Sequence, residues 1–291
     1  MNTASWIDAL CREERLPAGY GESVHRHVGP LAAKIVALHR TRARAVVVGI
    51  CGAQGSGKTT LALFLENWLR RESGLAATTL SLDDLYLGKQ ERLELADREH
   101  PLLRTRGVPG THDVGLAEEC LRTLTSVEGN AAIPVFDKTT DDRLPNARWR
   151  SVVSPVDVVL FEGWCVGARP QSDDELRTPV NALEAEEDTD GAWRRYSNDR
   201  LKNDYAALFR CLDALLLLRV PSFDKIIEWR GLQEEKLRGS CDQREIERFT
   251  RHFERLARHM LASMPGYANA LIDIEDDHRL ASLEFPDWPG T

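Results

Sequence analysis

The sequence lacks any apolar run long enough to cross a bilayer. Its N-terminal segment also has no apolar core of the kind that a secretion signal carries, because charged residues such as Arg12, Glu13, Glu14 and Arg15 interrupt it. These absences argue against a membrane partner or a secreted protein. We therefore expect a cytoplasmic location.

A zinc site and an excess of positive charge are missing as well. The cysteines show no C-x-x-C or other metal-ligand spacing, so free thiols in a reducing compartment are the simplest interpretation. With 38 Lys and Arg against 46 Asp and Glu, the formal net charge is −8, which argues against a nucleic acid as the main partner. A small-molecule substrate is the remaining expectation.

One glycine-rich stretch dominates the sequence. Residues Gly52 to Thr59 fill the phosphate-loop template G-x-x-x-x-G-K-[ST], after an apolar run at 45–50 and before a helical pattern. Glycines in this position let backbone N–H groups converge on an anion, and the start of the helix adds its partial positive charge there. The residues expected to bind the phosphates are Gly52, Ala53, Gln54, Gly55, Ser56, Gly57, Lys58, Thr59 and Thr60.

Carboxylates follow two other apolar runs. Asp83 and Asp84 come directly after the strand expected at 77–82, and Glu162 ends the near-continuous apolar run at 156–163. The carboxyl ends of parallel strands share one edge of an open α/β sheet, where such folds bind ligands. Glu162 and the Thr59 hydroxyl are therefore the candidate Mg²⁺ ligands.

Three polar segments complete the candidate site. A rigid loop carries Arg106, His112 and Asp113 around Gly107, Pro109 and Gly110, and a second loop at 134–143 carries Lys138. Loops this polar can hold a small anionic or hydroxylated molecule. The charged helical stretch at 223–238, which includes Arg230, follows a fourth apolar strand and is expected to form a closing lid.

The remaining segments are expected to support this core. Residues 1–44 are interpreted as an N-terminal helical extension, 45–280 as the nucleotide-binding domain and 281–291 as a C-terminal tail. Residues 89–100 are interpreted as a charged, exposed stretch. The segment at 170–193 is acidic and poor in apolar residues, so it is expected to be an exposed insertion.

Six separated segments, in this order, resemble those of the phosphoribulokinase and uridine-kinase-like group of P-loop kinases. Within that group the chain is most similar to the D-glycerate 3-kinases and related ATP-dependent kinases. The segments are 52–60, 81–87, 106–113, 134–143, 158–167 and 229–238. The chain departs from the usual pattern on the acceptor side, with Leu85 where a phenylalanine is common and with Thr139, Thr140 and Asp141 where a serine and glycines are usual.

The resemblance implies a three-layer α/β sandwich of the P-loop NTPase type, with five parallel strands in the order 2-3-1-4-5 and a helical lid at 222–240. It implies ATP and Mg²⁺ as cofactors and a hydroxylated metabolite, most simply D-glycerate, as the phosphoryl acceptor. The catalytic residues would be Asp83, Lys58 and Arg230. The acceptor side would consist of Asp83, Tyr86, Arg106, His112, Asp113 and Lys138.

Three alternatives stay open at this point. A kinase for another acceptor, such as a nucleoside, pantothenate or a sugar-like molecule, would share every nucleotide-side feature. A guanine-nucleotide switch is disfavoured because the sequence has no N-K-x-D motif. An ATP-gated interaction protein would use its acidic segment at 170–190 to dock a partner.

Overall fold

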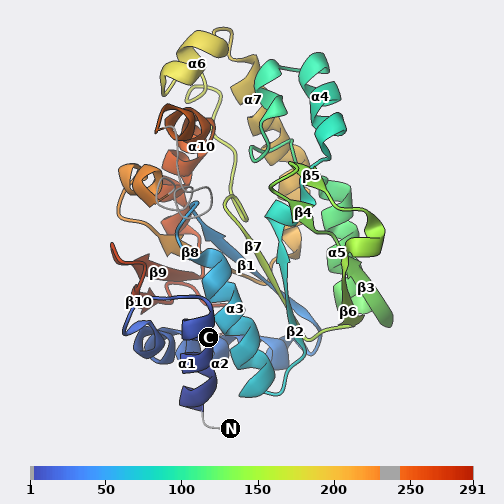
Figure 1. The fold of residues 1–291 in the computed structure, drawn as a ribbon, viewed down its shortest axis with the longest axis vertical. Helices are drawn as coiled ribbons and strands as arrows, with labels where there is room; N and C mark the ends of the chain where they lie inside the picture. The colour runs from blue at the N-terminus through green and yellow to red at the C-terminus, as the bar shows by residue number, and fades with distance from the viewer. Residues whose placement is uncertain (1–2, 230–242, 291) are drawn as a thin grey trace.

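A six-stranded sheet runs through the centre of the computed structural model, which describes residues 3–229 and 243–290 (Figure 1). Its strand order is β10-β9-β8-β1-β7-β2. The strands from β9 to β2 in this order are parallel to one another, and β10 is antiparallel to β9. The strands are β1 (Val46–Gly52), β2 (Ala77–Ser81), β7 (Val158–Gly163), β8 (Ala214–Arg219), β9 (Ala270–Ile274) and β10 (Leu280–Glu284).

The parallel strands follow the expected order, but the expected number of strands was wrong. The sheet has six strands rather than five, because residues that we interpreted as the start of a tail form β10. In β10, Leu280 is buried against the N-terminal helices and Leu283 packs on the same core. Leu280 and Leu283 are three residues apart, and both can face this core because the pairing with β9 shifts register between Leu280 and Ser282.

Helices cover both faces of the sheet and give three layers. On one face, α1 (Thr3–Glu13), α2 (Tyr20–Arg42) and α3 (Lys58–Arg71) enclose a core with β1 and β8. On the other face, α5 (Val114–Ser126), α8 (Ala206–Leu208) and α10 (Gln243–Ser263) enclose a second core. Burial of the sheet on both faces explains why all residues of β1 and β7 are buried.

Two small antiparallel ribbons lie beside the main sheet. One pairs β3 (Gly129–Ile133) with β6 (Arg150–Ser154), and the other pairs β4 (Phe136–Asp137) with β5 (Asp142–Arg143). The turn between β4 and β5 contains Lys138, so the second polar loop of the sequence is a tight hairpin. Within the described ranges, 3–229 and 243–290, no helix is both long and apolar enough to cross a membrane.

The stretch at 89–100 is not simply charged and exposed. It forms α4 (Lys89–Arg98), and the Arg92 side chain on it is only 1% exposed. Arg92 donates hydrogen bonds to the carbonyl oxygens of Leu87, Arg104 and Asp141. A buried guanidinium is tolerated because these acceptors and a carboxylate replace water.

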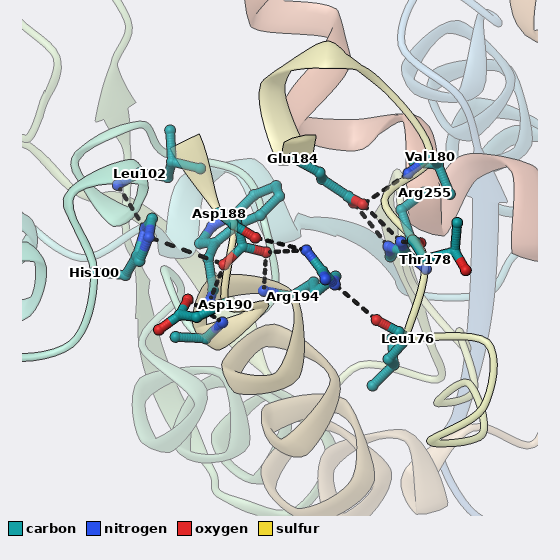
Figure 2. Close-up of polar contacts among 12 residues, drawn as sticks. His100, Leu102, Leu176, Thr178, Val180, Glu184, Asp188, Asp190, Arg194 and Arg255 are labelled. Carbon is teal, nitrogen blue, oxygen red and sulfur yellow. Dashed lines mark hydrogen bonds and ion pairs between the residues drawn. The ribbon is translucent and has the colours of Figure 1, made fainter. Parts of the chain in front are cut away.

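The acidic segment at 170–193 also differs from the exposed insertion that its composition indicated. It includes α6 (Ala182–Glu187) and leads into α7 (Ala192–Arg200), and these helices lie with α4 at the end of the molecule remote from both termini (Figure 1). Glu184 and Asp188 in this segment are fully buried. Figure 2 shows why: the Glu184 carboxylate receives two hydrogen bonds from Arg255, and Asp188 pairs with Arg194 at 2.9 Å.

The pair of Glu184 and Arg255 predicts a large stability difference. Replacing Arg255 with Leu leaves a buried carboxylate without its counter-ion, and should lower the free energy of unfolding by about 3–5 kcal/mol. The double variant Glu184→Leu/Arg255→Leu should be less destabilised than Arg255→Leu alone, because no unpaired charge remains. Urea denaturation measures both values.

A pair in the same segment supplies the control. Asp174 and Arg177 are 2.9 Å apart, but both side chains are about four-fifths exposed. Arg177→Leu should therefore leave the denaturation midpoint unchanged, since exposed ion pairs contribute little. Equal losses for Arg177→Leu and Arg255→Leu would contradict the buried-pair interpretation.

Candidate functional site

The phosphate-loop segment connects β1 to α3 in the conformation that an anion site requires. Gly55 and Gly57 have φ values of 78° and 84°, which L side chains rarely adopt, and Gly57 is the residue before the first turn of α3. The loop turns so tightly that a Cβ added at Gly52 would lie 2.6 Å from the Ser56 hydroxyl oxygen. Lys58 follows with a side chain only 9% exposed. The loop therefore leads directly into the start of α3, where backbone N–H groups can bind an anion.

Strand register brings the candidate metal ligands together beside this loop. Because β7 lies between β1 and β2, Glu162 is paired with Ile50 on one side and with Ser81 on the other. The Glu162 Oε1 atom accepts hydrogen bonds from Thr59 at 3.2 Å and from Ser81 at 2.7 Å. Burial raises the pKa of Glu162, although the charge of Lys58 opposes this effect.

These residues fit a hard cation. Thr59 and Glu162 offer a hydroxyl and a carboxylate, which are the oxygen ligands that Mg²⁺ prefers. The second carboxylate oxygen of Glu162 is buried and makes no hydrogen bond within the described part of the chain, and neither does the Ser56 hydroxyl. Buried oxygens without partners beside a phosphate loop match a site that is completed by a metal ion and a polyphosphate.

Asp83 lies one turn beyond β2 and is held by three groups. Its Oδ1 accepts a hydrogen bond from the Tyr86 hydroxyl at 2.7 Å, and its Oδ2 lies 2.8 Å from the Lys138 Nζ. Its backbone N–H donates to the Ser81 hydroxyl. Burial raises the pKa of Asp83, but the charges of Lys138 and Lys58 and the two hydrogen bonds together lower it well below its ordinary value. Asp83 is therefore a carboxylate at neutral pH, and its side chain remains 24% exposed.

Asp84 has a different environment from its neighbour. Its Oδ1 accepts a hydrogen bond from the backbone N–H of Phe136 at 3.0 Å, which ties the start of β4 to this turn. Burial raises the pKa of Asp84, whereas that of Asp83 is lowered. Adjacent residues thus have separate tasks in the structure: Asp83 faces the cations, and Asp84 holds the hairpin that carries Lys138.

Tyr86 and His112 form a buried aromatic layer behind Asp83. Their rings stack with centroids 4.7 Å apart, and the His112 Nδ1 lies 2.6 Å from the Tyr205 hydroxyl. Burial lowers the pKa of His112 to about 3, so its imidazole is neutral. Burial also raises the pKa of Tyr86 well above its ordinary value, so the phenol keeps the proton that it donates to Asp83.

The remaining predicted acceptor residues are engaged by protein groups. Asp113 accepts a hydrogen bond from the N–H of Leu116 at the start of α5 and lies 3.1 Å from Arg143. Arg106 pairs with Asp141. The structure thus places Asp83, Tyr86, His112 and the charged ends of Arg106 and Lys138 around one turn, while Asp113 acts mainly as a helix cap. Arg230 lies outside the described residues, as does most of the expected lid.

Sequence reasoning missed three residues that shape the site. Ser81 links Glu162 to Asp83 through one hydroxyl, Arg92 joins three loops, and Asp141 pairs with both Arg92 and Arg106. A serine at the end of a buried strand, three residues before the second acid, is a local signal that could have identified Ser81. No local pattern identifies the partners of Arg92.

Comparison with known proteins defines the class. Residues 47–169 match the Phosphoribulokinase / Uridine kinase family. The chain is 32% identical over 223 residues to an uncharacterized kinase of Schizosaccharomyces pombe, which covers 72% of the chain and 79% of that protein. It is 30% identical over 215 residues to the chloroplastic D-glycerate 3-kinase of Arabidopsis thaliana, covering 69% of the chain but only 44% of that protein.

A solved structure agrees with these sequence matches. The D-glycerate 3-kinase of Cryptococcus neoformans var. grubii superposes with a TM-score of 0.74 at 26% identity, over 89% of this chain and 98% of that one. The chain belongs to the phosphoribulokinase/uridine kinase family of P-loop kinases. It is an ATP-dependent small-molecule kinase, similar to the glycerate 3-kinases.

The two glycines of the phosphate loop predict unequal effects on stability. Both require a left-handed backbone, so alanine at either position should cost about 1–2 kcal/mol. A Cβ at Gly55 would also lie 2.9 Å from the Trp229 Cβ, whereas a Cβ at Gly57 would meet no atom within 4 Å. Gly55→Ala should therefore lose about 1–3 kcal/mol more than Gly57→Ala in urea denaturation of the nucleotide-free protein. Equal losses would show that Trp229 does not pack on the loop.

Proposed function

We propose that the protein transfers the γ-phosphate of ATP to a hydroxyl group of a small hydroxy acid, with D-glycerate as the acceptor and 3-phosphoglycerate as the product. The observation that carries this proposal is the ionised Asp83 between Lys138 and Lys58, one turn beyond the strand that contacts Glu162. The likeness to two D-glycerate 3-kinases supports the acceptor. The cytoplasmic location remains a prediction, and the five cysteines within the described ranges are free thiols.

On the nucleotide side, the residues from Gly52 to Thr60 would bind the phosphates, with Lys58 neutralising their charge. Thr59 and Glu162 would hold Mg²⁺, which supplies charge neutralisation between the phosphate oxygens. Ser81 would keep the Glu162 carboxylate in place by donating to Oε1. The protein contributes position and charge, which are the main requirements of phosphoryl transfer.

On the acceptor side, Asp83 would accept the proton of the attacking hydroxyl. Lys138 and Arg106 would bind the carboxylate of the acceptor, since a guanidinium and an ammonium are the groups that recognise carboxylates best. Tyr86 would orient Asp83 through its hydroxyl, with His112 packed behind it. Arg230 would come from the lid, in keeping with the family resemblance.

The choice of acceptor is tested by a screen with coupled detection of ADP. D-glycerate, glycerol, pantothenate and uridine would each be offered with ATP and Mg²⁺. Turnover of D-glycerate with formation of 3-phosphoglycerate supports the proposal, and preferred turnover of pantothenate or uridine would replace the acceptor. ATP binding without any phosphorylated product would favour an ATP-gated interaction protein.

Asp83→Asn tests the proposed base. The amide keeps the size of the side chain but cannot take the hydroxyl proton, so kcat should fall roughly 10²–10⁴-fold. The affinity for ATP, measured by titration calorimetry, should be nearly unchanged because Asp83 does not belong to the phosphate loop. Asp84→Asn is the matched control, since the amide oxygen can still accept the hydrogen bond from the Phe136 N–H that holds the β4–β5 hairpin. A normal kcat for Asp83→Asn would assign the base elsewhere.

Lys138→Met tests the electrostatic state of Asp83. Lys138 lowers the pKa of that carboxyl group, so its loss should raise the pKa. Asp83 acts as a base only when ionised, and the acidic limb of the kcat/KM profile should therefore move to higher pH. Lys138→Arg keeps the charge and should leave the limb in place. An unmoved limb in Lys138→Met, with only KM raised, would restrict Lys138 to binding.

A further inference from the structure

Two arginines of the acceptor side share one carboxylate. The Asp141 Oδ2 lies 2.6 Å from the Arg92 Nη2, and its Oδ1 accepts a hydrogen bond from Arg106. Both guanidinium groups lie 5.6 Å from the centre of the Phe136 ring. That ring also packs edge-to-face with Tyr86, whose hydroxyl donates a hydrogen bond to Asp83. The shared carboxylate is therefore linked to the proposed base through Arg106, the Phe136 ring and Tyr86.

The backbone fixes the position of Asp141. It has a φ of 58°, in the left-handed region, within the turn that joins β4 to β5. Its carbonyl oxygen accepts a second hydrogen bond from Arg92, at 2.9 Å. Aspartate is among the few residues with a side chain that occupy this backbone region readily. Asp141 is thus held between two cations by its main chain and its side chain together.

The two arginines differ in what they can still bind. Arg92 is fully buried, and it donates to three carbonyl oxygens besides the Asp141 carboxylate. Arg106 is 19% exposed, and among the described residues it donates a hydrogen bond to Asp141 alone. A guanidinium has five N–H donors. Arg106 therefore has donors left for a second anion, and Arg92 has few.

The group formed by Arg92, Arg106 and Asp141 has a net positive charge. Their side chains carry a net charge of +1, and Lys138 pairs with Asp83 nearby. The neighbouring Asp142 carboxylate also acts on Arg92, and it accepts hydrogen bonds from the backbone N–H groups of Lys89 and Arg143. A single carboxylate on the acceptor would bring the group to neutrality. An acceptor with two negative charges at its anionic end would place one of them beside the Asp141 carboxylate without compensation.

We propose that Asp141 is a specificity-determining residue, which sets the charge of the acceptor site so that it matches a monoanion and disfavours a dianion. The inference rests on the proposed function, because it concerns the same acceptor site. It adds that the site selects acceptors by their charge, a property that does not follow from the identity of the base. Asp141 acts through Arg106 and takes no part in proton transfer.

The test compares three probes of similar shape and rising negative charge. Glycerol is neutral, D-glycerate carries one charge, and sn-glycerol 3-phosphate carries nearly two at pH 8. The dissociation constant of each is measured with the wild-type protein and with Asp141→Asn, at low ionic strength and in the presence of ATP analogue and Mg²⁺. Asparagine suits the left-handed backbone and can still accept a hydrogen bond, so the turn should remain intact.

The affinity gain in Asp141→Asn should grow with the charge of the probe. Glycerol should bind as before, D-glycerate a few-fold more tightly, and sn-glycerol 3-phosphate about tenfold more tightly, because the variant removes one nearby negative charge. The gains should shrink as salt is added. Asp141→Gly, which also fits the backbone, should reproduce the pattern. Weaker binding of all three probes, or equal changes for all three, would overturn the inference and leave Asp141 with a structural role.

Asp97→Asn is the matched control. Asp97 pairs with Arg104 at 3.2 Å on the outer side of α4, and 72% of its side chain is exposed. This variant changes the total charge by the same amount without touching Arg106, so the charge series should not change. The proposed function fails separately: if the wild-type protein does not phosphorylate D-glycerate, the acceptor is wrong. If it does and the charge series is flat, only the role of Asp141 is wrong.

Discussion

The register of three parallel strands is the constraint on which the site depends. With β7 between β1 and β2, Glu162 is a direct neighbour of Ile50 and of Ser81, and the phosphate loop and the turn of Asp83 follow those strands by a few residues. A shift of β7 by one residue would point Glu162 at the opposite face of the sheet, because side chains alternate along a strand. Such a shift would break the hydrogen bonds of Glu162 to Thr59 and Ser81 and would misplace side chains that are closely packed on both faces. The two cores therefore fix the distance between the proposed metal ligand and the proposed base.

The environment of Asp83 depends on two elements attached to this sheet, the turn after β2 and the β4–β5 hairpin. Tyr86 belongs to the same turn, and Lys138 belongs to the β4–β5 hairpin, which Asp84 anchors through the N–H of Phe136. Asp84 thus helps to position Lys138, and the charge of Lys138 helps to keep Asp83 ionised. Opposite changes in their pKa values reflect this division, because Asp84 is buried beside a neutral amide whereas Asp83 faces charges.

Much of this could be predicted from local sequence, and the reason is physical. The phosphate loop, the buried strands and the acids after them are each encoded within about ten residues, and parallel topology then brings strand ends together. Residues whose environment depends on distant partners could not be predicted. Glu184 can be buried because Arg255, 71 positions away in the sequence, neutralises its charge. Arg92 can be buried because Asp141, 49 positions away, neutralises its charge. Composition indicates exposure for such residues, since it counts charges without their partners.

The buried pairs of the acidic segment differ from the pair of Arg106 and Asp141 beside the proposed acceptor site. Arg194 and Arg255 are almost fully buried, and each also donates to backbone carbonyl oxygens that hold its segment in place. Because both guanidinium groups are almost fully buried beside carboxylates, these pairs would be costly to break. Arg106 is partly exposed and retains donors, while Arg92 holds the far side of the same carboxylate. An ion pair that is buried on one side and partly exposed on the other keeps donors for a further anion, which is the property that the proposed acceptor site requires.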